Sequence, residues 1–311
     1  MRVYLLAFLL CWVLLPTWAD VLPLDDALRA TYSACVGIDD ELAELKKMAG
    51  INTAVTGVGT GLGAGATVVG IVKASKDKEV EVKLDKLREI EQRNPGVESS
   101  DADWGAFSAD MDAQKEAAKE EIARYKAEIE KLTKQSKSLG NWRTGLMAGG
   151  TVTNVAGAII AGTNKVDADL KTQIDNCIGS VKTLQISIMQ ARINGEDVSE
   201  AQSIASACVE YEYVDVSKIN NRAKGAMISS AVGAATGLAG TITSATANSN
   251  KIRDAQGDAA QQKEKNLNTA SNVLAGATTV ASATATVFNA TQISAIKKVA
   301  AVAEKCTGVL K

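Results

Sequence analysis

The 311-residue chain contains no histidine. Histidine is the usual base that activates a serine or cysteine nucleophile, and it is also the commonest metal ligand. The sequence also lacks a GxxxxGK phosphate-binding loop and a GxSxG nucleophile turn. We therefore expect no enzymatic activity, no catalytic residues, no cofactor and no metal site.

Aromatic residues are scarce, and neither sign of charge dominates. Aromatic side chains make up 4% of the chain, and 34 basic residues face 36 acidic ones. Nucleic-acid binding depends on a basic surface and on aromatic rings that stack on bases. We expect no nucleic-acid partner, and no small-molecule substrate is evident. Carboxylate clusters such as 39–41 are interpreted as solvated helix faces.

Proline is also rare, with three residues in the whole chain. Proline breaks helices, so its scarcity favours long uninterrupted ones. The predicted fold class is all-α, an elongated helical bundle.

The N-terminus has the pattern of a secretory signal peptide over residues 1–19. A basic residue at Arg2 precedes an apolar run over 3–15, and small residues lead up to a cleavage point after Ala19. The apolar run is too short for a comfortable membrane span. We predict export to the periplasm or cell envelope, either as a free protein or in association with a membrane.

Removal of the signal peptide leaves four cysteines. An even number of cysteines in an exported chain favours disulfides over metal or redox chemistry. They are Cys35, Cys177, Cys208 and Cys306.

Four stretches carry no charge and consist mainly of Gly, Ala, Ser, Thr and Val. They cover 48–72, 144–164, 225–250 and 266–296. Each is long enough as a helix to cross a bilayer, yet each is only weakly hydrophobic. This combination indicates helices whose backbones come into contact.

The stretches and the cysteines together indicate an internal duplication. Residues 136–165 and 220–251 share one pattern: Asn and Arg near the start, then a run of small residues, then Asn-Lys at the end. We predict two copies of one unit, 20–193 and 194–311, each with a cysteine, two small-residue helices and a second cysteine.

The duplication predicts a disulfide pairing. If the two helices of each copy are antiparallel, Cys35 meets Cys177 and Cys208 meets Cys306. Four cysteines allow three connectivities, so this pairing is a hypothesis from symmetry.

The first copy contains an insertion at 74–140 that the second lacks. Its apolar residues recur at spacings of three and four with Glu and Lys between them, as in coiled coils. The helix breaker 94–96 separates two such runs, so we predict a protruding helical hairpin that makes partner-specific contacts. The apolar residues are Val82, Leu84, Leu87, Ile90, Ile122, Tyr125, Ile129 and Leu132.

Small residues line up four apart within the uncharged stretches. Such rows let a second helix approach closely, and this contact must offset the cost of about 1 kcal/mol for each helical glycine relative to alanine. The pattern resembles the glycine-zipper segments of many bacterial envelope proteins. The predicted packing residues are Gly57, Gly61, Gly65, Gly145, Gly149, Gly157, Gly225, Gly233, Gly237, Ala277, Ala281 and Ala285.

Two functional hypotheses follow. The first is an exported, non-enzymatic structural or interaction protein of a bacterial cell envelope, which binds protein partners or itself through helix faces. The second is a membrane-active or pore-forming protein whose glycine-zipper-like helices insert into a bilayer. The many Asn, Ser and Thr residues of 266–296 oppose insertion, so the sequence favours a soluble bundle or one at a membrane surface.

Overall fold

The computed structural model describes residues 21–93, 109–249 and 258–310. The predicted signal peptide at 1–19 and the helix breaker at 94–96 lie outside these ranges. The structure is 93% helical and has no strand among the described residues, which confirms the all-α prediction.

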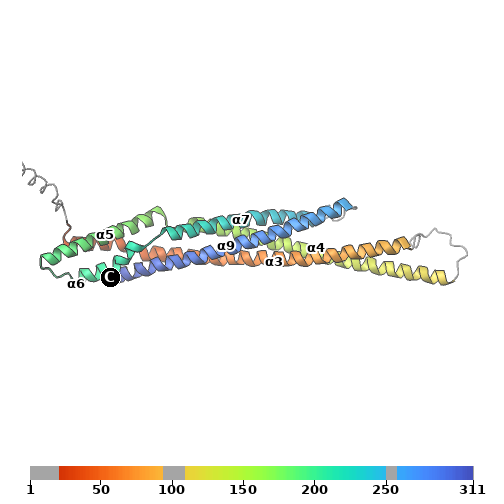
Figure 1. The fold of residues 1–311 in the computed structure, drawn as a ribbon, viewed down its shortest axis with the longest axis horizontal. Helices are drawn as coiled ribbons and strands as arrows, with labels where there is room; N and C mark the ends of the chain where they lie inside the picture. The colour runs from red at the N-terminus through yellow and green to blue at the C-terminus, as the bar shows by residue number, and fades with distance from the viewer. Residues whose placement is uncertain (1–20, 94–108, 250–257, 311) are drawn as a thin grey trace, which may run out of the picture. The chain divides into compact units, whose positions relative to one another are not determined.

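Seven α-helices and one 3₁₀ helix make up the described part of the chain (Figure 1). In chain order they are α2 Leu24–Cys35, α3 Ile38–Arg93, α4 Ala109–Thr163, α5 Ala168–Ile193, α6 Ser199–Cys208, η1 Val209–Tyr213, α7 Ser217–Ala247 and α9 Asp258–Leu310. Tight turns join α2 to α3 and α5 to α6. Each contains a glycine with positive φ, Gly37 at 92° and Gly195 at 81°, a conformation that other residues rarely adopt.

The helices begin at signals that the sequence carries. Pro23 directly precedes α2, and the acidic residues 39–41 occupy the first turn of α3, where the helix dipole favours negative charge. Asp167 caps α5 by accepting a hydrogen bond from the Leu170 N–H at 2.8 Å. No proline falls within any of these helices, so α3 and α4 continue over 56 and 55 residues.

The chain divides into two compact units. Among the described residues, unit 1 comprises 21–51, 161–224 and 288–310, and unit 2 comprises 52–93, 109–160, 225–249 and 258–287. Each unit takes residues from both predicted copies, because α3, α4, α7 and α9 contribute to both units. The spatial units therefore differ from the sequential division at 193/194.

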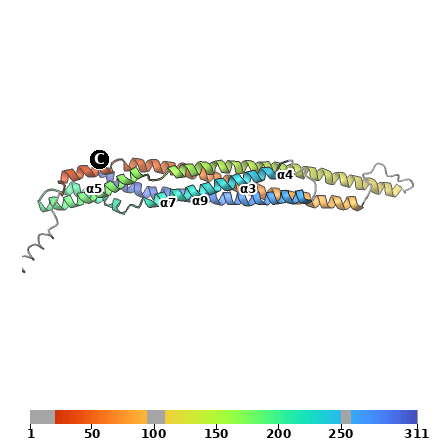
Figure 2. The same cartoon turned by 90° about the horizontal axis from the view of Figure 1, so that it is seen from above.

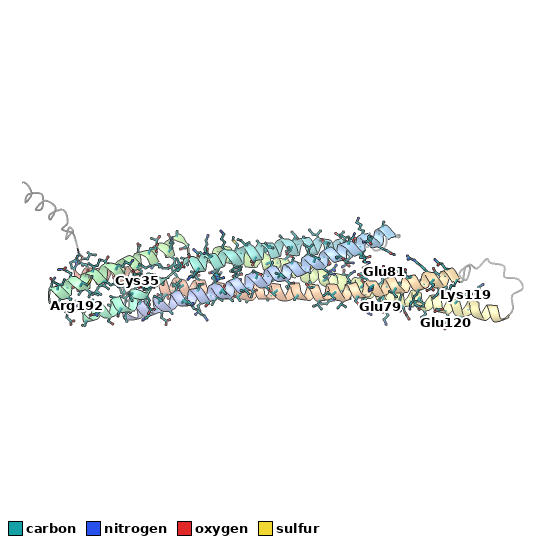
Figure 3. All side chains as sticks on the ribbon, viewed as in Figure 1. Cys35, Glu79, Glu81, Lys119, Glu120 and Arg192 are labelled. Atoms are coloured by element: carbon teal, nitrogen blue, oxygen red, sulfur yellow. A yellow bond between two sulfur atoms is a disulfide. The ribbon has the colours of Figure 1, made fainter. Side chains whose placement is uncertain are left out.

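Unit 1 has an ordinary apolar core with two disulfides inside it. The bonds join Cys35 to Cys177 and Cys208 to Cys306, which are the two pairs that the duplication predicts. Figure 3 labels Cys35 at the end of α2. The core packs α2 against α5 and includes the buried side chains of Ile38, Leu42, Leu170, Ile174, Leu184, Tyr211, Ile219 and Ile296.

Unit 2 is built from α3, α4, α7 and α9, which lie side by side (Figures 1 and 2). Side-chain hydrogen bonds between neighbouring helices include the contact between the Thr236 and Thr278 hydroxyls at 3.0 Å, which joins α7 to α9. The Thr60 and Thr286 hydroxyls join α3 to α9 at 3.5 Å.

The predicted hairpin is formed by α3 and α4 themselves. Each uncharged stretch in these helices and the adjoining hairpin arm make one continuous helix. Leu87, Ile122 and Leu132 are buried between the arms, and the Lys83 ammonium donates to Glu128 at 2.5 Å. Figure 3 shows the exposed side chains of Glu79, Glu81, Lys119 and Glu120 along these arms.

Candidate functional site

The most informative feature of unit 2 is an inverted distribution of polar and apolar side chains. It involves the segments 52–72, 144–160, 225–247 and 266–287, which we call the four apolar segments. In the segment of α3 the buried residues are Asn52, Thr56, Gly59, Gly63, Ala66 and Gly70. The exposed residues of the same segment are Ala54, Val58, Gly61, Ala64, Val68, Ile71 and Val72.

The other three segments repeat this arrangement. Their exposed large aliphatic residues are Val152, Val155, Ile159, Met227, Ile228, Val232, Leu238, Ile242, Val273, Val280 and Val287. Their buried polar residues are Asn154, Ser230, Ser244, Asn268, Ser271, Thr278 and Ser282. A helix of a water-soluble bundle places its apolar stripe toward the core and its polar residues outside. These segments instead bury many of their polar side chains and expose many of their aliphatic ones, around a small buried cluster of Ala66, Met147 and Ala275.

The exposed threonines of these segments satisfy their hydroxyl groups within their own helices. Thr246 donates to the Ile242 carbonyl at 2.8 Å, Thr269 to Lys265 at 2.9 Å and Thr284 to Val280 at 2.8 Å. Such bonds remove the need for water at the helix surface. The outward face is therefore compatible with an apolar environment.

Arg143 is the largest polar side chain in the interior of unit 2, and it is fully buried. Its guanidinium donates to the Ser244 hydroxyl at 3.1 Å, the side-chain oxygen of Asn272 at 2.8 Å and the side-chain oxygen of Asn268 at 2.9 Å. Three of its donors thus reach acceptors on two other helices. Arg143 fixes α4 against α7 and α9.

Lys73 forms a second buried polar centre. Its ammonium lies 2.6 Å from Asp77 Oδ2 and 3.7 Å from Glu264 Oε1, and its side chain is 1% exposed. The Ser136 hydroxyl donates to the other oxygen of Asp77. This cluster joins α3 to α4 and α9, and the ion pair compensates for the burial of the charge.

Asn154 forms a third polar contact inside unit 2. Its side-chain oxygen accepts from the Ser282 hydroxyl at 2.9 Å, and its amide donates to the Gly150 carbonyl at 2.9 Å. A Cβ added to Gly233 would lie 2.9 Å from the same amide group. At this contact a buried polar side chain of α4 lies where the backbone of α7 comes close to it.

Several predicted packing residues do lie at helix contacts. A Cβ at Gly157 would lie 2.8 Å from Thr56 Cγ2, and one at Gly237 would lie 2.6 Å from Thr151 Oγ1. Gly65 and Gly149 face Leu146 and Leu62 at 3.5 and 3.2 Å, and Gly233 faces Asn154. Ala281 and Ala285 are buried, Gly225 is half-buried and Ala277 is exposed.

The structure corrects the prediction for three of the packing glycines, Gly57, Gly61 and Gly145. A Cβ at Gly57, Gly61 or Gly145 would have no neighbouring atom within 4 Å, so these glycines make no close helix contact. On α3 the contact face belongs to Gly59 and Gly63, where a Cβ would lie 2.7 Å from a threonine hydroxyl oxygen. The sequence shows both rows, and only the neighbouring helices distinguish them. Gly70, Gly140 and Gly240 also make close contacts that the sequence reasoning missed.

A groove of about 730 Å³ lies in unit 2 beside the Lys73 cluster. It mixes acidic and basic groups, including Glu81, Arg88 and Lys265, and no single ligand chemistry fits it. The described residues contain no cluster of three or more His, Cys, Asp or Glu suited to a metal ion.

Four helices of the described chain are long and apolar enough, by length and composition, to cross a membrane. Together with the disulfides they are compatible with membrane association or export. No protein-family model, curated protein or solved structure matches this chain.

Proposed function

We propose that this chain is a non-enzymatic integral membrane protein of the cell envelope, anchored by the four apolar segments. The observation that supports this proposal is that each of these segments buries Asn, Ser or Thr side chains and exposes several of its Val, Ile and Leu residues. Such a distribution suits a bilayer, because the hydrocarbon layer is an apolar solvent for the outer face of a helix bundle.

Whatever shields the exposed aliphatic side chains from water must surround unit 2 on all sides. All four helices expose aliphatic side chains, so a second copy of the chain would cover only one side, whereas a bilayer covers every side. A helix of 20 residues is about 30 Å long, which equals the thickness of the hydrocarbon layer. The segment lengths therefore fit one crossing each.

The weak average hydropathy of the segments has a structural cause. Asn154, Ser244 and Thr278 lower the average, but they are buried between helices and would not contact lipid. Small and polar residues at helix contacts are a normal feature of membrane bundles. This distribution favours the membrane hypothesis over the soluble bundle.

The packed interior supports an anchor rather than an open pore. A Cβ at Gly237 would lie 2.6 Å from Thr151 Oγ1, and Arg143 fills the space between α4, α7 and α9. Helices this close leave little room for a water-filled passage. We propose that the anchor presents the disulfide-bonded unit 1 and the charged hairpin arms to protein partners.

Fractionation tests this proposal. The full chain should remain in the membrane pellet after an alkaline wash, and the purified protein should reconstitute into vesicles without releasing an enclosed dye. Release into the wash would support the soluble bundle instead. Retention in the pellet with rapid dye release would support a pore.

A matched pair of variants sharpens the test. The double variant Val152→Lys/Val280→Lys places charges on residues that are 68% and 67% exposed within the apolar segments. A lysine near the middle of a membrane span costs about 2.5–3.5 kcal/mol, so we expect strongly reduced membrane insertion. The control Val82→Lys changes a hairpin residue that is 48% exposed and should have no effect. A soluble bundle would tolerate all three substitutions equally.

A further inference from the structure

Unit 1 carries a group of exposed basic side chains next to the places where the chain enters the apolar segments. We call this group the basic collar. Its members are Lys46, Lys47, Lys165, Arg222, Lys224, Lys297 and Lys298.

Contacts within unit 1 hold these chain segments at one level. In the amide orientation that satisfies both of its groups, Asn164 donates to the Leu45 carbonyl at 3.1 Å and accepts from the Ala49 N–H at 2.9 Å. These bonds hold Asn164, which precedes Lys165, against the turn of α3 that contains Lys46 and Lys47. Gln292 of α9 donates to the Asn164 carbonyl at 2.7 Å. Three parts of the collar are thus fixed together.

The same network includes α7. Asn220 accepts from the Val166 N–H at 2.8 Å and donates to the Val166 carbonyl at 3.0 Å. The Arg222 guanidinium lies 6.0 Å from the centre of the Phe288 ring on α9. The basic residues of α7 and α9 therefore belong to the same level of unit 1.

Within the described part of the chain, no residue of the collar forms an ion pair with an acidic side chain. The ion pairs of unit 1 in the described chain are Lys182–Glu212, Lys218–Asp215 and Lys305–Glu210, and none involves the collar. The sequence has no acidic residue over 45–76, 131–166, 216–253 or 265–303, although Glu44 and Asp167 lie just outside. Exposed lysines on a soluble helix are normally mixed with acids. The stretches of chain that carry the collar therefore contain basic residues and no acidic ones.

Basic residues at the other end of the segments behave differently. Lys73 and Arg143 also adjoin apolar segments, but both are buried and satisfied by Asp77, Glu264, Asn268, Asn272 and Ser244. A basic residue next to an apolar segment is therefore not always exposed, and the exposure of the collar residues distinguishes them from Lys73 and Arg143. The collar side chains remain free to bind an external anion.

We propose that the basic collar binds the phosphate groups of anionic phospholipids in the bilayer around the apolar segments. This inference rests on the proposed function, because it requires the collar to lie at the height of the headgroups. Lysine and arginine near an anionic membrane surface attract its lipids, and the attraction weakens with salt.

Lipid selectivity of the full chain tests this proposal. The protein is reconstituted in phosphatidylcholine vesicles, and the association of spin-labelled phosphatidylglycerol is compared with that of spin-labelled phosphatidylcholine. We expect a preference of about fivefold for the anionic lipid, reduced by salt. The variant Lys46→Gln/Lys47→Gln/Lys297→Gln/Lys298→Gln should lower the preference to less than about twofold.

A matched control removes the same number of charges elsewhere. The variant Lys86→Gln/Lys119→Gln/Lys131→Gln/Lys134→Gln changes exposed hairpin residues and should keep the full preference. Equal losses in the two variants would overturn the proposal. Inorganic phosphate at the same concentration should not displace the lipid, and displacement would identify a site for free phosphate instead.

The outcomes separate this inference from the proposed function. A protein that resists the alkaline wash but shows no lipid preference would contradict the collar proposal alone. A protein that the wash releases would contradict both.

Discussion

At the scale of single residues, α3 of unit 2 carries two rows of small side chains that differ in how closely they approach other helices. Gly59 and Gly63 face threonines of neighbouring helices, whereas Gly57 and Gly61 face outward. The two rows are offset by two residues, which turns them by about 200° around the helix. Substitution of neighbouring glycines should therefore have opposite effects.

The pair Gly63→Ala and Gly61→Ala tests this difference. A Cβ at Gly63 would lie 2.7 Å from Thr279 Oγ1 and 3.2 Å from the Thr279 Cα, so the backbones must separate. We expect Gly63→Ala to lower the free energy of unfolding by about 2 kcal/mol. Gly61→Ala has open space and should raise it by up to about 1 kcal/mol through helix propensity. Denaturant titration in detergent micelles measures both, and a Gly63→Ala protein as stable as wild type would contradict the packing.

Tyr211 gives a prediction about pH. Its side chain is fully buried in unit 1, and its hydroxyl has no hydrogen-bond partner among the described residues. Burial, and then the negative charge of Asp39, raise the pKa of Tyr211 above its usual value near 10. The unfolded chain loses this proton first as the pH rises. The contribution of the Tyr211 side chain to the free energy of unfolding is therefore complete below pH 10 and falls as the pH rises above 10.

Tyr211→Phe should remove this dependence. We expect the variant to be as stable as wild type or more stable at pH 8, because it removes an unsatisfied buried hydroxyl. Between about pH 10 and 11 the wild type should lose stability faster than the variant. Thermal unfolding across this range measures the difference. Parallel pH profiles would show that Tyr211 does not ionise in the unfolding reaction.

At the scale of elements, α3 and α4 each combine two kinds of helix in one continuous rod. Residues 52–72 of α3 bury Gly, Thr and Asn, whereas its hairpin arm buries Leu87 and carries ion pairs such as Lys83–Glu128. The change occurs at the Lys73 cluster, where Ser136 of α4 donates to Asp77 of α3. Everything beyond this contact should be dispensable for the rest of unit 2.

Removal of 79–134 tests the independence of the hairpin arms. A short Gly/Asn turn between residues 78 and 135 can close the chain, since Asp77 and Ser136 are hydrogen-bonded. We expect the shortened protein to keep both disulfides and its membrane retention, with Tm within a few degrees of wild type. Circular dichroism and non-reducing peptide mapping provide the measurements. Loss of the native disulfides would show that the arms are needed for folding.

At the scale of the whole molecule, the chain order makes a prediction about membrane sidedness. The cysteines lie in 21–47, 165–224 and 297–310, and two apolar segments separate each of these parts from the next. An even number of crossings returns the chain to the same side, and disulfides form in oxidising compartments. On the proposed function, the hairpin arms 73–93 and 115–143 lie on the opposite side.

Maleimide labelling of single added cysteines checks this arrangement. Ser203→Cys in α6 and Ser75→Cys in α3 both alter exposed residues. In intact cells with a permeable outer layer, an impermeant maleimide should label the cysteine at 203 and not the one at 75. Lysis should make both reactive. Labelling of both before lysis would contradict four membrane crossings.

Much of this architecture could be predicted from local sequence properties. The scarcity of proline predicts long uninterrupted helices without reference to any other part of the chain. The duplicated positions of the cysteines also predicted the two disulfides, because an internal repeat carries information about long-range contacts. The hairpin was predicted from apolar residues spaced three and four apart, which is the spacing that packs one helical arm against another.

The sequence by itself determined the helices, the hairpin and the cysteine pairs, but tertiary structure decided which helix faces point inward. Gly57 and Gly59 belong to equivalent rows until a second helix occupies one side. Hydropathy averaged over a segment counts Asn154 and Val152 together, although one is buried and the other exposed. Burial depends on neighbours that are distant in the chain, and only their placement showed that the apolar side of unit 2 faces outward.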